Sequence, residues 1–517
     1  MLRLRATVVA AVTAACWLGA APPTRAADYG AVAGTIGAPA SWGSPGTWTG
    51  GAVPLAGDNA FVGSNNAPPG AVLSAVVALD ANRAATNVTL GNGAGTSGRL
   101  NLGNFTLTLS GTLSVGAGGT GTVGRGTGAF TAAAVAVAGA TSTLTFGAAD
   151  ATPTLTLTAG GTATTAAAGN VTQSVAVTDS RLNLGAALNL TGGTRTLAVA
   201  GDASVVDAQG FAVTAATVTL TRTSNVAGET SLINHGALTV ATLTTANVNL
   251  NLGGGDAVTT FTLTSGSSVL GAGAVVQSLA LGSGASATLG SSAGLAQSLA
   301  ITGGSTLSLA ANLNLTAGSR AISVTGAGSN LNAAGNGVSA GSLTVGAAGS
   351  ASSLTNPGAV IVSGQLTVAG TSAITLASGS DSVGSVSLLD TAQLTVNKAG
   401  QTVGLTITGT PAGSLAIATG AKLHAVLDGA AAGGYALRWA NPAGGDHVAD
   451  LQALIAANKI DFTFVNGGVF TVDSLSSQGG FTFLLSQPVP EPALLLAAAA
   501  LPLAVRRLRR AVVGRAT

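Results

Sequence analysis

The chain has 517 residues, of which 47% are hydrophobic and only 7% are charged, and its formal net charge is +2. This composition excludes an intrinsically disordered protein, because disorder requires low hydrophobicity together with high net charge. Aromatic residues make up 3% of the sequence and glycine numbers 76. Any core must therefore be built from small aliphatic side chains, and many turns are expected.

The N-terminus has the features of a secretory signal peptide. Arg3 and Arg5 precede an apolar run over about residues 6–21, and small residues follow at Ala26 and Ala27. A charged start, an apolar middle and a small-residue exit are typical of a leader that is removed on export. We therefore expect export through the inner membrane and cleavage near Ala26 or Ala27, with a retained anchor as the alternative.

The only cysteine, Cys16, lies in this leader. It follows Thr13-Ala14-Ala15, a loose match to the lipoprotein cleavage box, in which an aliphatic residue usually stands where Thr13 does. Lipidation of Cys16 is therefore an alternative. Otherwise the mature protein has no cysteine, which excludes disulfides and thiol catalysis.

The C-terminus combines three features in a fixed order. The triplet Pro490, Glu491 and Pro492 precedes the apolar segment 493–505, and a basic cluster follows within 506–510, made of Arg506, Arg507, Arg509 and Arg510. This order resembles the PEP-CTERM sorting signal of exported bacterial proteins. The resemblance implies transient membrane association through the apolar segment, processing by an exosortase-type enzyme, and release or attachment at the cell surface.

The basic residues support part of this expectation without the resemblance. Arginines beside a membrane segment stay on the cytoplasmic side, so arginines at both ends place the body of the chain outside. The apolar segment has 13 residues and contains Pro502. As a helix it spans about 20 Å, against a hydrocarbon core of about 30 Å. A short, interrupted span favours a removable label, with a lasting C-terminal anchor as the alternative.

The charge of the body differs from that of the whole chain. Three of the 19 basic residues lie in the leader and five follow Val505, which leaves 11, whereas only Glu491 of the 17 acidic residues lies in the tail, which leaves 16. The body is thus slightly acidic and has no basic patch. Nucleic acid is excluded as a partner on electrostatic grounds.

Alternation of apolar and hydroxyl side chains predicts short β-strands between about Val72 and Thr408. Thr152–Thr158 reads TPTLTLT and Thr217–Thr223 reads TVTLTRT. Alternate residues of a strand point to opposite faces, so Leu and Val face inward and Thr faces outward. Clusters of Gly, Ser and Ala separate these runs, as turns should.

Repeated sequence segments within the chain indicate a repeating architecture. Residues 188–210 align without gaps on 313–335 with 11 of 23 positions identical, and QSLAL at Gln277 returns as QSLAI at Gln297, a period of 20. Such a period with short strands indicates an all-β protein, a parallel β-helix or solenoid in which stacked coils bury one another. An antiparallel sandwich or barrel array is the alternative. The region also resembles the Gly/Thr-rich β-strand repeats of large exported bacterial proteins and autotransporter passengers.

The flanks of the repeats differ from them. Trp42 and Trp48 lie in a segment that we expect to cap the first coil, with carbohydrate stacking on these rings as the alternative. Near the other end, Asp446 can cap a short helix over His447–Asn458. The predicted order is a signal peptide (1–26), an N-terminal cap segment (27–66), β-solenoid repeats (67–412), a small C-terminal β-rich cap with one short helix (413–487) and the sorting signal (488–517).

Candidate chemical sites are sparse. GAGGTG at 116–121 matches a dinucleotide fingerprint, but no helix pattern follows it, so we expect a solenoid turn. Asp446, His447 and Asp450 form a close acid–histidine cluster that favours helix capping over metal ligation. Asp202 and Asp207, near Asp179-Ser180-Arg181, are candidate carboxylates of a polysaccharide-cleaving β-helix. The internal copy replaces them by Ala327 and Asn332.

Two further patterns concern the outer surface. Outward threonine rows resemble those of ice-binding β-helices, although their spacing is not constant. Asn-X-Thr glycosylation sequons occur at Asn87, Asn104, Asn170, Asn189 and Asn314, as expected by chance in a chain so rich in threonine.

We therefore expect a non-enzymatic, envelope-sorted structural or adhesive protein of the cell surface or extracellular matrix, with no cofactor and no metal. Its expected partners are the secretion machinery and an exosortase-type sorting enzyme, with extracellular polysaccharide as a further candidate. A carbohydrate-active β-helix enzyme, a lyase or a hydrolase, is the main alternative, and an ice- or glycan-binding surface protein is a lesser one.

Overall fold

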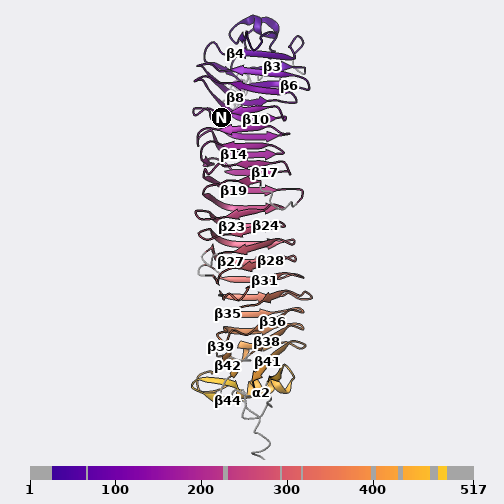
Figure 1. Cartoon of the computed structure of the whole chain (residues 1–517), viewed down its shortest axis with the longest axis vertical. Coiled ribbons are helices and arrows are strands. Elements are labelled where there is room, and N and C mark those ends of the chain that lie inside the picture. Colours follow the sequence, from indigo (N-terminus) through magenta and orange to yellow (C-terminus); the bar gives the residue numbers. More distant parts are fainter. Residues whose placement is uncertain are drawn as a thin grey trace, which may run out of the picture. The chain divides into compact units, whose positions relative to one another are not determined.

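The computed structural model describes residues 26–65, 68–224, 231–290, 294–315, 318, 320–397, 403–428, 435–465 and 475–485. The chain forms two compact units, the first comprising Met1–Thr219 and Ser231–Gly236 and the second Leu220–Thr230 and Ala237–Thr517. Within each unit, strands of neighbouring coils pair in parallel, apart from antiparallel pairings near the end of the second unit. The stacked arrows of Figure 1 illustrate the parallel pairing. The predicted β-solenoid fold is confirmed. Among the described residues, no helix is long and apolar enough to span a membrane.

A typical coil contains one long, bent strand and one short strand. In the first unit, β10 (Ala129–Ala138) pairs with β8 (Thr106–Val115) on both sides of a register shift between Ala132 and Ala134. The short strand β11 (Thr143–Thr145) then completes the coil and pairs only with other short strands. The bend at the bulge gives the long strand two faces, and the short strands form a third.

The strands of the first unit fall into these two groups. The long strands and their fragments are β1 (Asp28–Gly30), β3 (Asn59–Ser64), β5 (Arg83–Ala85), β6 (Asn87–Asn92), β8, β10, β12 (Thr152–Thr158), β14 (Val171–Thr178), β16 (Leu188–Asn189), β17 (Thr196–Ala200) and β19 (Val213–Thr221), whose last residues belong to the second unit. The short strands are β2 (Ala40–Ser41), β4 (Ser74–Ala78), β7 (Ser97–Asn101), β9 (Thr120–Gly124), β11, β13 (Thr162–Thr165), β15 (Arg181–Leu184), β18 (Val205–Asp207) and β20 (Leu232–Ile233).

The second unit repeats the scheme. Its long strands and their fragments are β21 (Leu238–Ala246), β23 (Ala257–Thr264), β25 (Val275–Gly282), β27 (Leu295–Ile301), β29 (Leu313–Asn314), β30 (Ala321–Val324), β32 (Val338–Ala340), β33 (Ser342–Val345), β35 (Val360–Val368), β37 (Ser382–Leu388), β39 (Val403–Ile407), β40 (Leu415–Ile417), β42 (Tyr435–Ala440), β44 (Leu475–Gln478) and β45 (Phe481–Leu485). Its short strands are β22 (Leu250–Leu252), β24 (Ser267–Leu270), β26 (Ser286–Leu289), β28 (Thr306–Leu309), β31 (Asn330–Asn332), β34 (Ser353–Thr355), β36 (Ala373–Leu376), β38 (Gln393–Asn397), β41 (Lys422–Asp428) and β43 (Ile460–Val465).

Helices are few. The described residues contain the 3-10 turns η1 (Pro45–Thr47), η2 (Thr49–Gly51) and η4 (Ala412–Ser414) and the helix α2 (Val448–Ala456). The helix is shorter than predicted, and His447 is its N-cap residue. The Asp446 carboxylate nevertheless accepts the Val448 N–H at 3.1 Å, as a capping acid should.

The core consists of aliphatic side chains stacked in register from coil to coil. Leu157 pairs with Val137 in the preceding coil and Val177 in the next, and all three are 0% exposed. Beside them, Thr156 pairs with Ala136 and Ala176 on the outer face. The expected division of Leu and Val inside and Thr outside is confirmed, and the narrow interior explains the preference for small aliphatics.

The internal copies adopt equivalent structures. The first copy forms β16, β17 and β18, and the second forms β29, β30 and β31 at matching positions. Arg195 and Arg320, which correspond in the alignment, both have a left-handed backbone, with φ of 51° and 48°. The QSLA repeats lie in adjacent coils, where Gln297 donates to Gln277 at 3.1 Å. The repeated glutamine thus links the two coils through its side-chain amide.

The N-terminal tryptophans close the end of the first unit. Trp42 and Trp48 are 0% and 2% exposed, and their ring centroids lie 4.9 Å apart in an edge-to-face arrangement. The Trp48 indole N–H donates to the Trp42 carbonyl oxygen at 2.7 Å. Both rings therefore act as a cap, and neither presents a face on which a sugar could stack.

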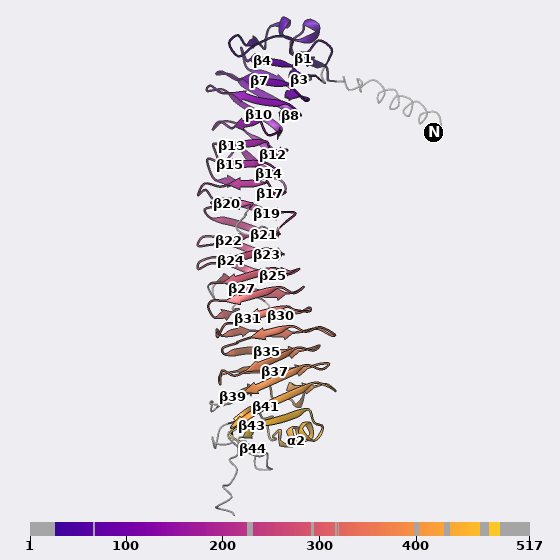
Figure 2. The same ribbon diagram turned by 45° about the vertical axis from the view of Figure 1, so that its right-hand side comes forward.

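The coils continue beyond the predicted limit of the repeats at residue 412. Strand β41 pairs in parallel with β38, and β43 pairs in parallel with β41, where Leu423 faces Ile460. The change of period in the sequence thus reflects wider coils rather than their end. Only β44 and β45 depart from the scheme, because they add antiparallel strands to β42. Helix α2 lies beside β43 and β44 in this last part of the second unit (Figure 2).

Aspartates recur at the corner where a short strand leads into the next long strand. Each carboxylate accepts the backbone N–H of the residue three positions earlier and a backbone N–H of the preceding coil. These corner aspartates are Asp58 (Leu55, 3.0 Å; Ala27, 3.2 Å), Asp150 (Gly147, 2.7 Å; Phe130, 2.8 Å), Asp256 (Gly253, 2.7 Å; Leu238, 2.8 Å) and Asp381 (Ser378, 3.3 Å; Val360, 2.8 Å).

The corner aspartates tie consecutive coils together at buried positions. Asp150, Asp256 and Asp381 are each 2% exposed. Burial raises the pKa of the Asp381 carboxyl, although hydrogen bonds from Val360 and Ser378 act in the opposite direction. At the equivalent corner of another coil, Asn170 accepts two backbone N–H groups and donates to two carbonyl oxygens. These side chains supply partners for backbone groups that the corner removes from water.

We predict that Asp256→Ala opens its corner locally, because it leaves the Leu238 and Gly253 N–H groups buried without acceptors. Hydrogen exchange of these two amides should accelerate about 10- to 100-fold. Asp256→Asn keeps one acceptor and should have a smaller effect, and Asp390→Asn, at an exposed carboxylate, should leave both amides unchanged. Unaltered exchange in Asp256→Ala would contradict this role.

Candidate functional site

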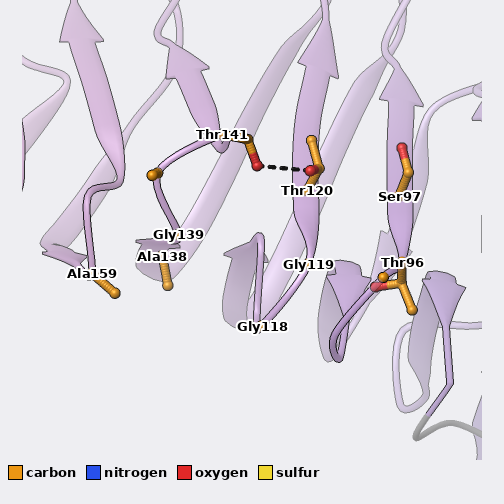
Figure 3. Close-up of a pocket in the computed structure, with 11 residues that line it drawn as sticks. Thr96, Ser97, Gly118, Gly119, Thr120, Ala138, Gly139, Thr141 and Ala159 are labelled. Atoms are coloured by element: carbon orange, nitrogen blue, oxygen red, sulfur yellow. Dashed lines mark hydrogen bonds between the residues drawn. The ribbon is translucent and has the colours of Figure 1, made fainter.

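A trough of about 590 Å³ lies in the first unit. It lies where long strands turn into short strands in successive coils, and glycine, alanine, serine and threonine line it (Figure 3). Ser97 pairs in register with Thr120, and the Thr120 and Thr141 hydroxyls lie 2.8 Å apart. Three neighbouring coils thus present a row of hydroxyl groups to the trough.

Glycines make this trough possible. Gly118 has a φ of 92°, a left-handed conformation that favours glycine. A Cβ at Gly119 would lie 2.3 Å from the Thr96 Oγ1 atom. Both residues belong to the GAGGTG segment at 116–121, which leads into strand β9 rather than a helix. The segment is therefore a solenoid turn, as expected, and not the start of a phosphate-binding helix.

The chemistry available in the trough is limited to hydrogen bonding. Its lining residues carry hydroxyl groups and exposed peptide groups, and none of them has a side chain that titrates near neutral pH. The hydroxyls of neighbouring coils lie side by side, and those of Thr120 and Thr141 are close enough to hydrogen-bond to each other, so the row suits a ligand that carries hydroxyl groups of its own. The arrangement can bind such a ligand, but these residues supply no general acid or base.

The carboxylates considered for polysaccharide cleavage have structural partners. Asp207 forms an ion pair with Arg181 at 2.7 Å and accepts a hydrogen bond from Asn234 at 3.1 Å. It also accepts the Gln209 N–H at 3.2 Å, and Asn332 of the internal copy accepts the corresponding N–H at 3.1 Å. Because asparagine serves this turn equally well, the local geometry needs an oxygen acceptor rather than an ionised carboxylate.

His447 joins the helix to the last coils. Its ring is 1% exposed and stacks on Trp439 with the centroids 3.8 Å apart. One ring nitrogen lies 2.7 Å from the Asp450 carboxylate and the other lies 2.9 Å from the Thr410 carbonyl oxygen. The acid–histidine cluster thus fixes α2 against the solenoid. Across the described ranges, no group of three or more metal-ligating side chains comes together.

A second acid–histidine pair, His424 and Asp461, was not predicted from the sequence. The His424 Nδ1 atom lies 2.5 Å from Asp461 Oδ1, and the Lys422 ammonium lies 3.3 Å from Asp461 Oδ2. Burial opposes ionisation of Asp461, but the hydrogen bonds and charges of His424 and Lys422 outweigh it and hold the pKa of this carboxyl below 3.8. Parallel register brings these residues together, because His424 on β41 faces Asp461 on β43.

Thr395 lies on the other side of His424 in the same register. The order Thr395, His424 and Asp461 has the residue types of a nucleophile, a base and an orienting acid. No hydrogen bond joins Thr395 to His424, although both lie in the part of the chain that the structure describes. The pair therefore does not form a nucleophile–base contact in this structure.

The sorting residues Pro490, Glu491, Pro492, Arg506, Arg507, Arg509 and Arg510 lie outside the described residues. The expected cleavage position lies at the start of the described chain, where the Ala27 N–H donates to Asp58 at 3.2 Å. Of the sequon asparagines, Asn170 is buried and fully hydrogen-bonded, whereas Asn104 is exposed. Burial excludes glycosylation of folded Asn170.

Comparisons with known proteins assign no relative. No protein-family model matches the chain, and neither the curated proteins nor the solved structures contain a match. The function must therefore be inferred from the chemistry of the chain itself.

We predict that the Asp461 pair stabilises the last coils in a pH-dependent manner. A carboxyl whose folded-state pKa is lowered adds stability above about pH 3.8, and that stability disappears as the pH falls through the folded-state value. Asp461→Asn should therefore melt at a lower temperature than the wild type at pH 6, and the difference should vanish in strong acid. Asp179→Asn, at an exposed carboxylate, is the control. A difference in melting temperature that stays constant as the pH is lowered through the acid range would contradict the prediction.

Proposed function

We propose that this protein is an exported, envelope-sorted β-solenoid with a structural or adhesive role at the cell surface, and that it has no catalytic activity. The proposal combines the leader and the C-terminal sorting pattern with the solenoid body. The leader directs export, the PEP-CTERM-like tail directs sorting by an exosortase-type enzyme, and the body supplies an extended protein surface outside the cell.

The observation that carries the structural role is how the body uses its few charged groups. Arg125 pairs with the buried Asp150, Arg181 pairs with Asp207, and His447 is held by Asp450. Each pair connects a turn, a coil or the helix to its neighbours. The trough, in contrast, offers hydroxyl groups to a ligand and no acid or base. Charge in this body supports the scaffold, as a structural protein requires.

A carbohydrate-active enzyme is the second candidate, and Thr395, His424 and Asp461 are the residues that favour it. Purified full-length protein should leave acidic and neutral polysaccharides intact over long incubation, when chain length is followed by size-exclusion chromatography. Cleavage that is lost in His424→Ala but kept in His235→Ala would replace the structural proposal by the enzymatic one.

We predict that the tail is required for sorting. Replacement of Pro490, Glu491 and Pro492 by alanine should leave the protein unprocessed and attached to the membrane, because the sorting enzyme no longer recognises it. Cell fractionation with C-terminal mass spectrometry measures both outcomes. A matched alanine replacement of Ser486 and Gln487, just before the triplet, should leave sorting unchanged.

The mature wild-type protein is expected at the cell surface without Arg506, Arg507, Arg509 and Arg510. Detection of these arginines on mature, surface-exposed protein would count against sorting with cleavage. N-terminal sequencing of the same sample should begin at or next to Ala27.

A further inference from the structure

An unusual aromatic cluster lies on the outer face of the last strands of the second unit. Tyr435 and Phe483 have ring centroids 5.3 Å apart, and Phe481 lies 6.3 Å from Phe483. These three rings and Arg438 are half-buried, and we refer to the four residues as the Arg438 platform. Elsewhere in the described chain Phe105 and Phe211 are also partly exposed, but the ring pairs Trp42–Trp48 and Phe130–Phe146 are buried. In a chain with 3% aromatic residues, three partly exposed rings in one place call for an explanation.

The fold places these side chains together by two devices. Strand β45 alternates, so Phe481 and Phe483 face outward while Thr482 and Leu484 are buried. A register shift between Tyr435 and Leu437 brings Tyr435 to the same outer face as Arg438, which pairs with Phe483. Strand β45 is hydrogen-bonded to β42 along one edge and to β44 along the other. Figure 1 labels β42 and β44 near the orange and yellow end of the chain.

The guanidinium of Arg438 rests on the rings of Phe481 and Tyr435. Its Cζ atom lies 4.5 Å from the Phe481 centroid and 5.6 Å from that of Tyr435. Its buried Nε atom makes no hydrogen bond. Within the described residues, no carboxylate forms an ion pair with it. A partly desolvated cation gains more from an incoming anion than a fully hydrated cation does.

The platform therefore combines flat apolar faces with a planar donor fork. An arginine fork matches a carboxylate with two parallel hydrogen bonds, and aromatic faces stack on the C–H face of a sugar ring. A sugar that carries a carboxylate satisfies both. An extended peptide cannot add to β45 itself, because β42 and β44 already occupy both of its edges.

We propose that the Arg438 platform binds the uronate residues of an acidic extracellular polysaccharide. The sugar ring stacks on Phe481 and Phe483, and its carboxylate accepts hydrogen bonds from the Arg438 guanidinium. This site gives the adhesive role proposed above a specific ligand. It rests on that proposal in one respect, because the protein must be exported to encounter an extracellular polysaccharide. Stacking on the two phenylalanine rings buries apolar surface of the sugar, and the positive charge of Arg438 favours a uronate over a neutral sugar.

The test is calorimetric titration of the full-length protein at low ionic strength with an oligogalacturonate and with a neutral galactose oligomer. The wild type should bind the acidic oligomer and discriminate against the neutral one by at least about tenfold, as expected for a charge-assisted pair. Arg438→Gln should lose that discrimination. Arg438→Lys keeps the charge without the planar fork and should retain part of it, and Phe483→Leu should weaken binding through lost stacking. Arg320→Gln, at an exposed arginine of the same unit, is the matched control.

Several results would overturn the site. Equal affinity of the wild type for both oligomers, or unchanged binding in Arg438→Gln, removes the role of the cation. Tighter binding of an acidic peptide, with the same dependence on Arg438, would assign the platform to a protein partner instead. Far-ultraviolet circular dichroism and melting of each variant show whether it folds, and Arg438→Lys remains informative if Arg438→Gln does not. Fractionation tests export independently, so a protein that binds uronate but stays inside the cell would refute only the proposed function.

Discussion

Closure of each coil removes the backbone of its corners from water, and the hydrogen bonds made there hold the solenoid together. A buried N–H group without an acceptor costs about 1–3 kcal/mol, so every corner needs an internal partner. Asp150, Asp256 and Asp381 meet this need twice each, once within their own turn and once in the preceding coil. The same carboxylate therefore shapes a turn and sets the register between two coils, and the aliphatic stacks follow from that register.

The need for partners at buried corners also explains where the few charged residues are placed. Only 7% of the residues are charged, and several of them serve the interior rather than solvent. Arg125 approaches the buried Asp150 and also lies over the Phe130 ring at 5.3 Å, so one cation serves a corner and a core aromatic side chain. Arg438 lies on aromatic rings in the same way, but no acid of the described chain pairs with it. That contrast singles out the Arg438 platform from the structural ion pairs.

Local pattern predicted the repeating part of the fold well and the sites poorly. Alternation in Thr152–Thr158 and the copies at 188–210 and 313–335 were enough to predict strands, stacking and equivalent coils. The corner aspartates carried a visible signal, an acid three residues after the turn begins and just before an alternating run. In contrast, His424 and Asp461 lie 37 residues apart in sequence, and the intervening coil is too irregular for a periodic argument. Such contacts depend on how two distant strands are aligned in the folded protein, and a short sequence motif does not predict that alignment.

Coil length varies while the pairing of strands does not. Leu250 faces Ser268 across a coil of 18 residues, whereas Leu423 faces Ile460 across one of 37. The longer coil contains β42 and α2, yet the short strands at its two ends still pair in register. Because the entropy of closing a loop grows only slowly with its length, added residues at a corner cost little. Each corner is thus an insertion point where evolution, or an engineer, can enlarge one coil and give it a new surface without repacking its neighbours.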